Sequence, residues 1–519
     1  MQRAEMIQQL EATAEWDICI IGGGATGLGI AVDAASRGLK TLLLEKFDFA
    51  KGTSSRSTKL VHGGVRYLQQ GNIKLVIEAL KERGMLLKNA PHLVKNQSFI
   101  VPNYKWWEGP FYGFGLKVYD WMAGSLGLGP SQFLSREETL QLAPTLDEEG
   151  LRGGVLYHDG QFDDARLAIH LAMTAADHGA TVLNYAGVEK LLKEKGKVCG
   201  VQFTEAILAK QYEIRSKVVI NATGVFTDSI LKMDDANAET LITVSQGIHI
   251  VLDRNFLSSD TAIMIPRTDD KRVLFAVPWH HKIIIGTTET PIDKVSDEPV
   301  VLHEEVEFVL HHISKYLTKD PGLADIRSVF AGLRPLVKGN TKYTAALSRE
   351  HHIAISDSEL ITIVGGKWTT YRKMAEDVLD IAVIKAGLQS NECKTRELAI
   401  HGYKNETDFD SPLYYYGSDQ EFILQMIKTG ETPGEFIHPA FPFIKAEIIW
   451  AVQQEMCMTV EDFLSRRTRA LLLDAKAAIE SAPLVASVMA KELQRNDDWI
   501  RNQVDIFNTL AQNYLPSIN

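Results

Sequence analysis

Three glycines spaced as Gly22-x-Gly24-x-x-Gly27 form the pattern with the clearest chemical meaning in this sequence. Small residues at this spacing let a phosphate approach the backbone amides at the start of a helix, where the helix dipole favours negative charge. An apolar run precedes the glycines, small residues follow them, and Glu45 ends a second apolar run, where a carboxylate can bind a ribose hydroxyl. We therefore predict that Gly22, Gly24, Gly27 and Glu45 bind a dinucleotide.

The glycine pattern does not distinguish FAD from NAD, because both cofactors use it. A later segment helps: Ala222-Thr223-Gly224 follows an apolar run, and its small residues allow the backbone to pass close to a bound dinucleotide. A similar Ala-Thr-Gly element occurs in FAD proteins. Together with the late glycine pair Gly365-Gly366, it favours FAD as the cofactor.

Hydrophobic patterns place these glycines in an α/β fold. Apolar runs at 16–21 and 40–44 predict two strands that flank a helix at 25–37. The other predicted elements are helices at 163–178 and 370–386 and strands at 180–183, 188–192, 198–203, 212–214, 217–221 and 360–364. The short strands in the middle resemble the β-meander of large flavoproteins. We expect a Rossmann-like FAD-binding domain of the glutathione-reductase/amino-acid-oxidase type, with a β-rich substrate domain and a C-terminal α-helical domain.

The order of these patterns predicts a discontinuous organisation. A glycine- and aromatic-rich segment and a strand-rich segment interrupt the α/β pattern, and helical periodicity dominates the last part of the chain, where Thr459 and Asp462 predict a capping box. The predicted ranges are 14–90, 150–230 and 350–390 for the FAD-binding domain, 91–149 and 231–349 for the substrate-binding domain, and 391–519 for the helical domain.

Composition excludes several classes of function. The chain has 519 residues and a net charge of −11, which argues against nucleic-acid binding. The four cysteines are far apart and the histidine pairs are adjacent in sequence, so we expect no disulfide framework and no metal. The first fifteen residues lack a signal-peptide pattern, no apolar run is long enough to span a bilayer, and no Gly-x-Ser-x-Gly hydrolase motif occurs. We expect an intracellular protein whose membrane contact, if any, is peripheral.

Hydroxyls, cations and a glycine pair are combined in the segment Thr53-Ser-Ser-Arg-Ser-Thr-Lys-Leu-Val-His-Gly-Gly-Val-Arg-Tyr-Leu68. This segment closely resembles the FAD-dependent, quinone-linked glycerol-3-phosphate dehydrogenases. The resemblance covers nearly the whole chain and continues through Gln246-Gly-Ile-His249, Ile285-Gly-Thr-Thr-Glu289, Gly332-Leu-Arg-Pro335, Gly365-Gly-Lys-Trp-Thr-Thr-Tyr-Arg372 and Glu461-Asp-Phe-Leu-Ser-Arg-Arg-Thr-Arg469.

The resemblance implies oxidation of glycerol 3-phosphate to dihydroxyacetone phosphate by hydride transfer to FAD, with electrons then passed to the quinone pool. A phosphate dianion needs fixed cations, and Arg66, Arg334 and Lys367 stand at the family's substrate positions. Tyr67 either binds the substrate or packs. Removal of the hydroxyl proton requires a base or proton relay, and His249 matches the family position suited to that role. The resemblance thus implies His249, Arg334 and Lys367 as catalytic residues.

The same resemblance implies further contacts to the cofactor. His62 ranks second to His249, as a residue that orients the flavin or its loop. Glu289 departs from the family, which often has aspartate there, so the role of this carboxylate stays open. The remaining predicted cofactor contacts are Ser54, Ser55, His62, Gly63, Gly64, Gly366, Lys367, Thr369 and Thr370, in addition to the glycine and Ala-Thr-Gly motifs.

Two clusters leave alternatives open. The aromatic residues of 106–114 lie near lysines, and they fit either a lipid headgroup layer, a quinone entrance or a packed core. Arg466, Arg467 and Arg469 fit either anionic lipid or an acidic helix. We expect a cytoplasmic protein peripherally associated with the inner face of the cytoplasmic membrane, with a homodimer as an open alternative.

Three other functions compete with the dehydrogenase. A glycerol-3-phosphate oxidase would use oxygen as acceptor on the same fold, but the family's oxidases usually carry a long insertion that this sequence lacks. A flavoprotein amine or amino-acid oxidase would not need the cations Arg66, Arg334 and Lys367. A non-catalytic flavin-binding protein would keep the glycine motif without this full set.

Overall fold

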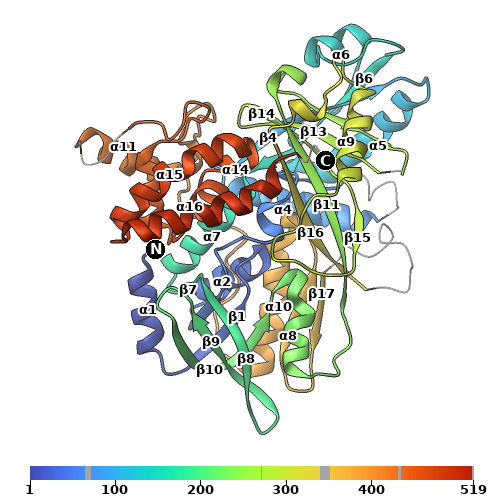
Figure 1. The fold of residues 1–519 in the computed structure, drawn as a ribbon. Coiled ribbons are helices and arrows are strands. Elements are labelled where there is room, and N and C mark those ends of the chain that lie inside the picture. Colours follow the sequence, from blue (N-terminus) through green and yellow to red (C-terminus); the bar gives the residue numbers. More distant parts are fainter. Residues whose placement is uncertain (65–71, 271, 339–350, 431–433, 517–519) are drawn as a thin grey trace.

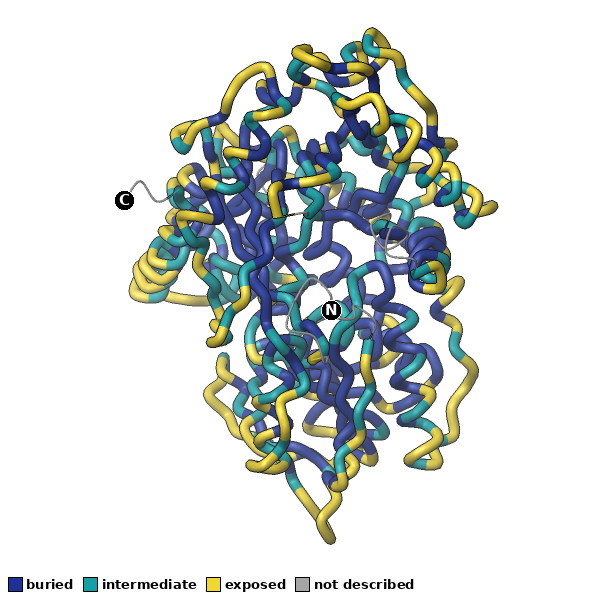
Figure 2. Tube along the Cα trace, turned by 90° about the vertical axis from the view of Figure 1, so that its right-hand side faces the viewer, coloured by how far each residue is buried: buried dark blue, intermediate teal, exposed yellow. Residues whose placement is uncertain are grey.

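The structure is a computed structural model that describes residues 1–64, 72–270, 272–338, 351–430 and 434–516. Arg66 and Tyr67, two of the predicted substrate contacts, lie outside the described residues. The molecule contains two sheets with helices around them, and the C-terminal helices, red in Figure 1, lie beside the second sheet and beside a helix that covers the first. Buried residues run through the interior of both halves, while exposed residues lie mainly in peripheral loops and turns (Figure 2).

The first sheet contains the predicted βαβ start. Strand β1 (Trp16–Ile21) pairs in parallel with β2 (Thr41–Leu44) on one side and with β10 (Lys210–Asn221) on the other. The described strands of this path follow the order β17 (His351–Ile355), β18 (Ile361–Gly365), β10, β1, β2 and β7 (Thr181–Leu183). The strands are short apolar runs buried by helices, as parallel sheets require. The covering helices are α2 (Ala25–Ser36), α7 (Asp164–Asp177) and α10 (Tyr371–Ala386).

The meander differs from the prediction at one point. The segments 212–214 and 217–221, predicted as separate strands, form the single strand β10. Its first half pairs antiparallel with β9 (Lys197–Glu205), which in turn pairs with β8 (Ala186–Glu194), and its second half pairs with β1. Buried Ile214 and Ser216 alternate with exposed Arg215, which is the pattern of a continuous strand with one covered face.

The second sheet holds the strand-rich part of the chain. Long antiparallel pairings join β11 (Ile242–Asp253) to β16 (Ser328–Val337) and β4 (Val94–Asn103) to β6 (Gly153–Phe162). The remaining described strands are β3 (Leu60–Val61), β5 (Gln132–Leu134), β12 (Ala262–Ile265), β13 (Leu274–Trp279), β14 (Lys282–Gly286) and β15 (Thr290–Ile292). The core on one face includes Ile248 and Ile250 of β11 and Val309 of helix α9 (His303–Ser314).

Helices connect and flank these sheets. The N-terminal helix α1 (Arg3–Ala12) packs near β7, and α8 (Thr227–Asp234) follows the Ala222–Gly224 segment. The α-helices that the structure describes between β3 and β6 are α4 (Ile73–Asn89), α5 (Glu108–Ala123) and α6 (Arg136–Leu142). No helix within the described ranges is long and apolar enough to cross a membrane.

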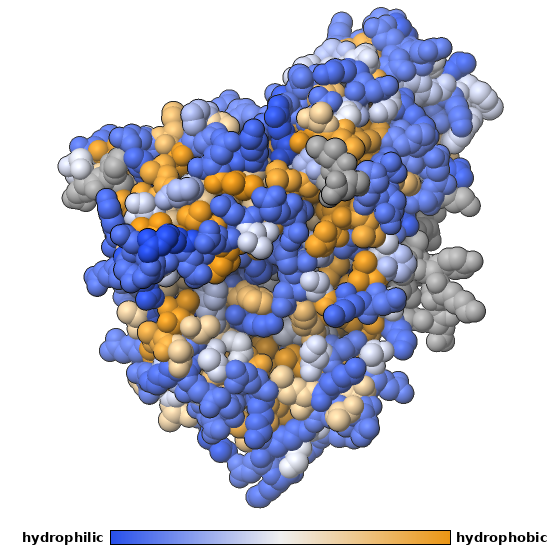
Figure 3. Space-filling model, viewed as in Figure 1, coloured by the Kyte–Doolittle hydropathy of each residue, from blue (hydrophilic) through white to orange (hydrophobic). Residues whose placement is uncertain are grey.

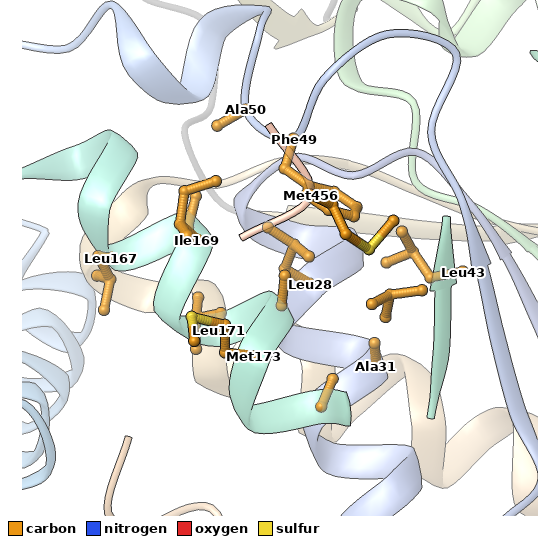
Figure 4. Packing of buried hydrophobic residues seen from close by; sticks show 14 of the residues in the cluster. Leu28, Ala31, Leu43, Phe49, Ala50, Leu167, Ile169, Leu171, Met173 and Met456 are labelled. Carbon is orange, nitrogen blue, oxygen red and sulfur yellow. The ribbon is translucent and has the colours of Figure 1, made fainter. Parts of the chain in front are cut away.

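The C-terminal part is helical, as predicted. Its helices are α11 (Gln420–Lys428), α12 (Lys445–Gln454), α13 (Val460–Asp462), α14 (Ala470–Leu473), α15 (Ala475–Glu492) and α16 (Asp497–Ala511). The predicted capping box is confirmed, because Thr459 and Asp462 bond each other's backbone amides. Met456 from this part shares one hydrophobic core with Leu28 of α2 and Ile169 of α7 (Figure 4). Hydrophobic residues also gather at the surface between the C-terminal helices and the sheets (Figure 3).

Candidate active site

The glycine loop packs directly against the Ala222 backbone. Gly22 has a φ of +111°, and a Cβ there would lie 2.7 Å from the carbonyl oxygen of Ala222. A Cβ on Gly27 would overlap the carbonyl of Gly22. Helix α2 begins after Gly24 without a side-chain cap, so its first amides face the loop, although Ala25 N donates to Ser54 Oγ over 2.9 Å. This geometry suits a pyrophosphate at the helix start.

Glu45 holds the same loop from the end of β2. Its carboxylate accepts hydrogen bonds from Gly23 N at 2.6 Å and from Phe47 N at 2.9 Å. Burial raises the pKa of Glu45, and these two amide donors oppose that shift. The predicted ribose contact stays a prediction, but the carboxylate lies on the wall of the cavity described next.

A cavity of about 1670 Å³, including its open mouth, extends from the glycine loop towards the second sheet. Most of the predicted cofactor residues on the first sheet share its wall, and Gly224 has a φ of +59° with open space beside it. The predicted residues that line it are Gly22, Gly24, Glu45, Ser54, Ala222, Thr223, Gly224, Gly366 and Lys367. Glycines that leave no room for a Cβ at one end, a carboxylate and a long open cavity fit FAD.

Two further cavities continue from the first. The next has a volume of about 1090 Å³ and shares Lys367 and Trp368 with the cavity at the glycine loop, and we call it the flavin cavity. The last has a volume of about 1070 Å³ and shares Thr58, His62 and Arg334 with the flavin cavity, and we call it the substrate cavity. The structure therefore brings His62, His249, Arg334, Lys367 and Thr369 to the flavin cavity.

His249 lies on β11, on the face opposite the core that contains Ile248 and Ile250. Its ring is buried, and Nε2 lies 2.9 Å from Thr58 Oγ1, whereas Nδ1 has no hydrogen-bond partner among the described residues. Burial, and then the positive charges of Lys59 and Arg334, keep the pKa of His249 well below its ordinary value. The imidazole is therefore neutral at working pH.

Arg334 is oriented by a hydroxyl and by backbone carbonyls. Its Nη2 donates to Thr287 Oγ1 over 2.9 Å and its Nη1 donates to the carbonyl of Thr288 over 3.1 Å. Thr288 is itself fixed, because its Oγ1 donates to Glu305 Oε1 and accepts from Ile248 N. The guanidinium therefore holds a defined position between the flavin and substrate cavities, as an anion site requires.

The irregular segment His62–Gly64, which we call the active-site turn, follows β3 and lies at this site. His62 N donates to Thr369 Oγ1 over 3.2 Å, which links the turn to the segment after β18. His62 and Gly64 line the substrate cavity, whereas Gly63 packs against neighbouring side chains. Four predicted cofactor residues line none of the three cavities, namely Gly27, Ser55, Gly63 and Thr370.

Sequence reasoning missed two residues of the site. Thr58 bonds His249 and lines both inner cavities, and the hydroxyl-rich segment around it was the available signal. Arg272 lines the substrate cavity, with its Nε 3.1 Å from Asp270 Oδ2. A basic residue just before an apolar strand gives no sequence signal that separates it from a surface cation. Glu289, the departure from the family, is buried on the same wall.

The arginines near the C-terminus pair with carboxylates inside the protein. Arg466 Nε lies 2.6 Å from Asp48 Oδ2, and Arg467 Nη1 lies 2.7 Å from the same oxygen. Arg469 Nη2 lies 2.8 Å from Asp164 Oδ1. All three guanidiniums are buried, so the lipid alternative for them is wrong. They join the C-terminal helices to the loop after β2 and to α7.

Comparison with known proteins identifies related families. The family described as FAD dependent oxidoreductase matches residues 17–372, and the C-terminal domain of alpha-glycerophosphate oxidase matches residues 356–499. The mitochondrial glycerol-3-phosphate dehydrogenase of Mus musculus is 40% identical over 97% of this chain and 74% of its own length. A probable enzyme of the same name from Caenorhabditis elegans is 42% identical over 95% of this chain and 72% of its own length.

A solved structure extends the similarity to the fold of the whole chain. The glycerol-3-phosphate dehydrogenase from Bacillus halodurans, complexed with FAD, is 29% identical, with a TM-score of 0.81 over 100% of this chain and 98% of that one. The expected FAD-binding fold with its helical C-terminal domain is thereby confirmed. The chain belongs to the family of FAD-dependent glycerol-3-phosphate dehydrogenases.

Proposed function

We propose that this chain oxidises sn-glycerol 3-phosphate to dihydroxyacetone phosphate and passes the electrons to a membrane quinone. FAD, when bound, supplies the hydride acceptor. The observation that carries this proposal is that neutral His249 and oriented Arg334 line the same flavin cavity, which adjoins the cavity at the glycine loop. A proton acceptor and a fixed cation are the two groups that oxidation of a phosphorylated alcohol requires.

Arg334 and Lys367 would bind the substrate phosphate, together with Arg66. Both described cations line the flavin cavity, and Arg334 also lines the substrate cavity. At an effective dielectric constant near 20, one ion pair at about 4 Å gives roughly 4 kcal/mol before desolvation. Two or three such contacts would dominate recognition. They would also place the three-carbon chain against the flavin cavity.

His249 would take the proton of the substrate hydroxyl at Nε2. The Thr58 hydroxyl, 2.9 Å from this nitrogen, lines both inner cavities and connects it to the substrate. Stacking on Phe330 fixes the ring plane. Because burial already keeps the imidazole neutral, no preceding deprotonation is needed at neutral pH.

A turnover assay tests the reaction and its acceptor. Purified protein loaded with FAD is given glycerol 3-phosphate and a soluble quinone analogue, first under nitrogen and then in air. We expect dihydroxyacetone phosphate in equal amount to the reduced quinone, with little hydrogen peroxide in air. Peroxide production that matches product formation would instead identify an oxidase. Equal rates with unphosphorylated glycerol would contradict the proposed phosphate site.

Helix α5 is proposed as the contact with the membrane. Phe114 and Trp121 on this helix are 72% and 82% exposed, and Trp106 just before it is 78% exposed. The opposite side of α5 is buried through Leu116 and Tyr119. An exposed aromatic face next to Lys117 is typical of a helix lying in a headgroup layer, and monomeric surfaces rarely expose such a patch without a partner. We place this contact on the inner face of the cytoplasmic membrane.

Vesicle sedimentation tests this contact. The double variant Phe114→Ser/Trp121→Ser should lose most binding to vesicles containing phosphatidylglycerol. Ile384→Ser is the matched control, because Ile384 is an 81% exposed apolar residue on α10, in another part of the molecule. Equal vesicle binding by all three proteins would remove α5 from the membrane contact.

The domain ranges predicted from the sequence are kept as a proposal. Strands β3 and β6 lie within residues assigned to the FAD-binding domain, yet both belong to the second sheet, where β6 pairs with β4 on one side and with β3 on the other. Each strand ends close to the active-site turn or to α7. We therefore propose that these two strands connect the domains and belong functionally to the boundary between them.

A further inference from the structure

We infer that Tyr119 is a positioning residue that ties the active-site turn His62–Gly64 to helix α5. The part of this inference that concerns lipid rests on the proposed membrane contact of α5. The part that concerns the turn rests on geometry alone. Tyr119 lies far from Gly63 in sequence, and no motif in the chain links them.

The link is a chain of two hydrogen bonds through one hydroxyl. Gly63 N donates to Tyr119 Oη over 2.8 Å, and Tyr119 Oη donates to Asp159 Oδ2 over 2.8 Å. The hydroxyl thus donates its hydrogen bond to the carboxylate, and an oxygen lone pair accepts the hydrogen bond from the Gly63 amide. The tyrosine is 1% exposed, so water does not compete for either bond.

Asp159 also connects the end of α5 to the same point. Its Oδ1 accepts from Arg83 Nη1 over 2.7 Å, and Arg83 Nη2 donates to the carbonyl of Leu126 over 3.2 Å. Leu126 belongs to the helical turn that directly follows α5. The Asp159 carboxylate therefore contacts α5 directly through Tyr119, and it is linked through Arg83 to the residues just after α5. Asp159 also lines the substrate cavity.

The turn has no space in which to move independently of α5. A Cβ on Gly63 would lie 2.5 Å from the Tyr119 hydroxyl and 2.5 Å from Leu80 Cδ2. The Gly63 backbone is therefore packed against α5, which carries Tyr119, and against α4, which carries Leu80. His62, the preceding residue, lines the flavin and substrate cavities. A displacement of α5 must therefore either move His62 or break the hydrogen bond to Gly63.

Tyr119 and the exposed aromatic residues occupy opposite sides of one short helix. Trp121 is only two positions away and 82% exposed. Seating the outer side of α5 on lipid restricts the helix, and through Tyr119 it restricts the turn that contacts the site. We thus infer that lipid binding orders the His62–Gly64 turn.

Hydrogen–deuterium exchange of the FAD-loaded protein measures this link without substrate. In Tyr119→Phe we expect the amide of Gly63, followed in a peptide covering residues 58–64, to exchange at least about 10-fold faster than in wild type. Tyr112→Phe is the matched control: it makes the same change in a buried tyrosine of α5 whose hydroxyl has no hydrogen bond to the described residues. A peptide covering 16–21 reports whether the fold is intact in both variants.

Phosphatidylglycerol vesicles provide the second arm. They should slow exchange of the 58–64 peptide in wild type and in Tyr112→Phe, but not in Tyr119→Phe, which should still sediment with the vesicles. The kcat/KM for glycerol 3-phosphate should fall about 10-fold in Tyr119→Phe alone. An unchanged exchange rate of the 58–64 peptide in Tyr119→Phe would overturn the positioning role. The lipid link would be overturned if vesicles slowed this exchange equally in all three proteins, or if they did not slow it in wild type. If the protein does not oxidise glycerol 3-phosphate, the proposed function is wrong, but the exchange result still holds because that experiment uses no substrate.

Discussion

The imidazole of His249 stacks on the ring of Phe330, with ring centroids 4.8 Å apart and planes inclined by 17°. This contact buries the ring that we propose as the proton acceptor. We predict that His249→Asn lowers the rate of flavin reduction by about 10²- to 10⁴-fold, the usual range for loss of a general base. Rapid-mixing absorbance measures this rate.

The control for this variant is His312→Asn. His312 is also buried, but it lies on α9 and bonds the carbonyl of Phe308 and the amide of Asp269. It should leave flavin reduction unchanged. A rate for His249→Asn within twofold of wild type would exclude His249 as the base.

Arg334→Ala should lower kcat/KM for glycerol 3-phosphate by about 10- to 100-fold, mostly through KM, because one charge-assisted hydrogen bond contributes roughly 1.5–3 kcal/mol. Steady-state kinetics measure the effect. Arg327→Ala is the control, since Arg327 precedes the same strand but is 45% exposed and pairs with Asp253. Equal kinetics in both variants would remove Arg334 from the phosphate site.

Arg467→Met should destabilise the protein by about 3–5 kcal/mol, because it leaves the buried carboxylate of Asp48 without one of its two cations. Burial alone raises the pKa of Asp48, but the charges of Arg467 and Arg466 outweigh burial and lower it. Urea unfolding measures the change. In Arg215→Met, which breaks an exposed pair with Glu194, the free energy of unfolding should stay close to that of wild type. Similar losses in both would show that the buried cluster is not a stabilising link.

His401 predicts how the stability of the protein depends on pH. His401 Nδ1 lies 2.6 Å from Asp177 Oδ2, and His401 Nε2 lies 2.9 Å from Asp419 Oδ2. Burial alone lowers its pKa, but the hydrogen bonds to these carboxylates outweigh burial and raise the pKa of His401 to about 9. Its stabilisation is complete below about pH 6.5, the ordinary value for histidine, and disappears as pH rises through about 9.

Unfolding temperatures at pH 6, 7.5 and 9.5 test this prediction. Wild type should lose more stability over this range than His401→Gln, and the two proteins should converge at the highest pH. Parallel curves would mean that the ion pair contributes nothing.

Local patterns predicted much of the first sheet. The glycine spacing, the apolar run of β1 and the Thr459 cap each depend on neighbours in sequence, and the structure confirms these elements. Alternation along a strand also explains why His249 and Ile248 face opposite sides. The continuity of β10 was missed because polar residues at 215–217 resemble a turn, whereas pairing with two different strands keeps the backbone extended there.

Contacts between distant residues carry no such local signal. The bond from Gly63 to Tyr119 and the ion pair between Asp48 and Arg467 depend on how whole elements pack. The charge of Arg467 was visible in the sequence, but its burial was not. The same limit explains why Arg272 was missed, since only the packing of the strands in the second sheet brings it to the substrate cavity.

Anaerobic titration of the FAD-loaded protein with sn-glycerol 3-phosphate tests the central claim most directly. The absorbance of oxidised flavin is recorded after each addition, with glycerol as the control alcohol. We predict that glycerol 3-phosphate bleaches the flavin with formation of one dihydroxyacetone phosphate per flavin, and that glycerol at the same concentration does not. Oxidised flavin that persists at saturating glycerol 3-phosphate would contradict the proposed reaction.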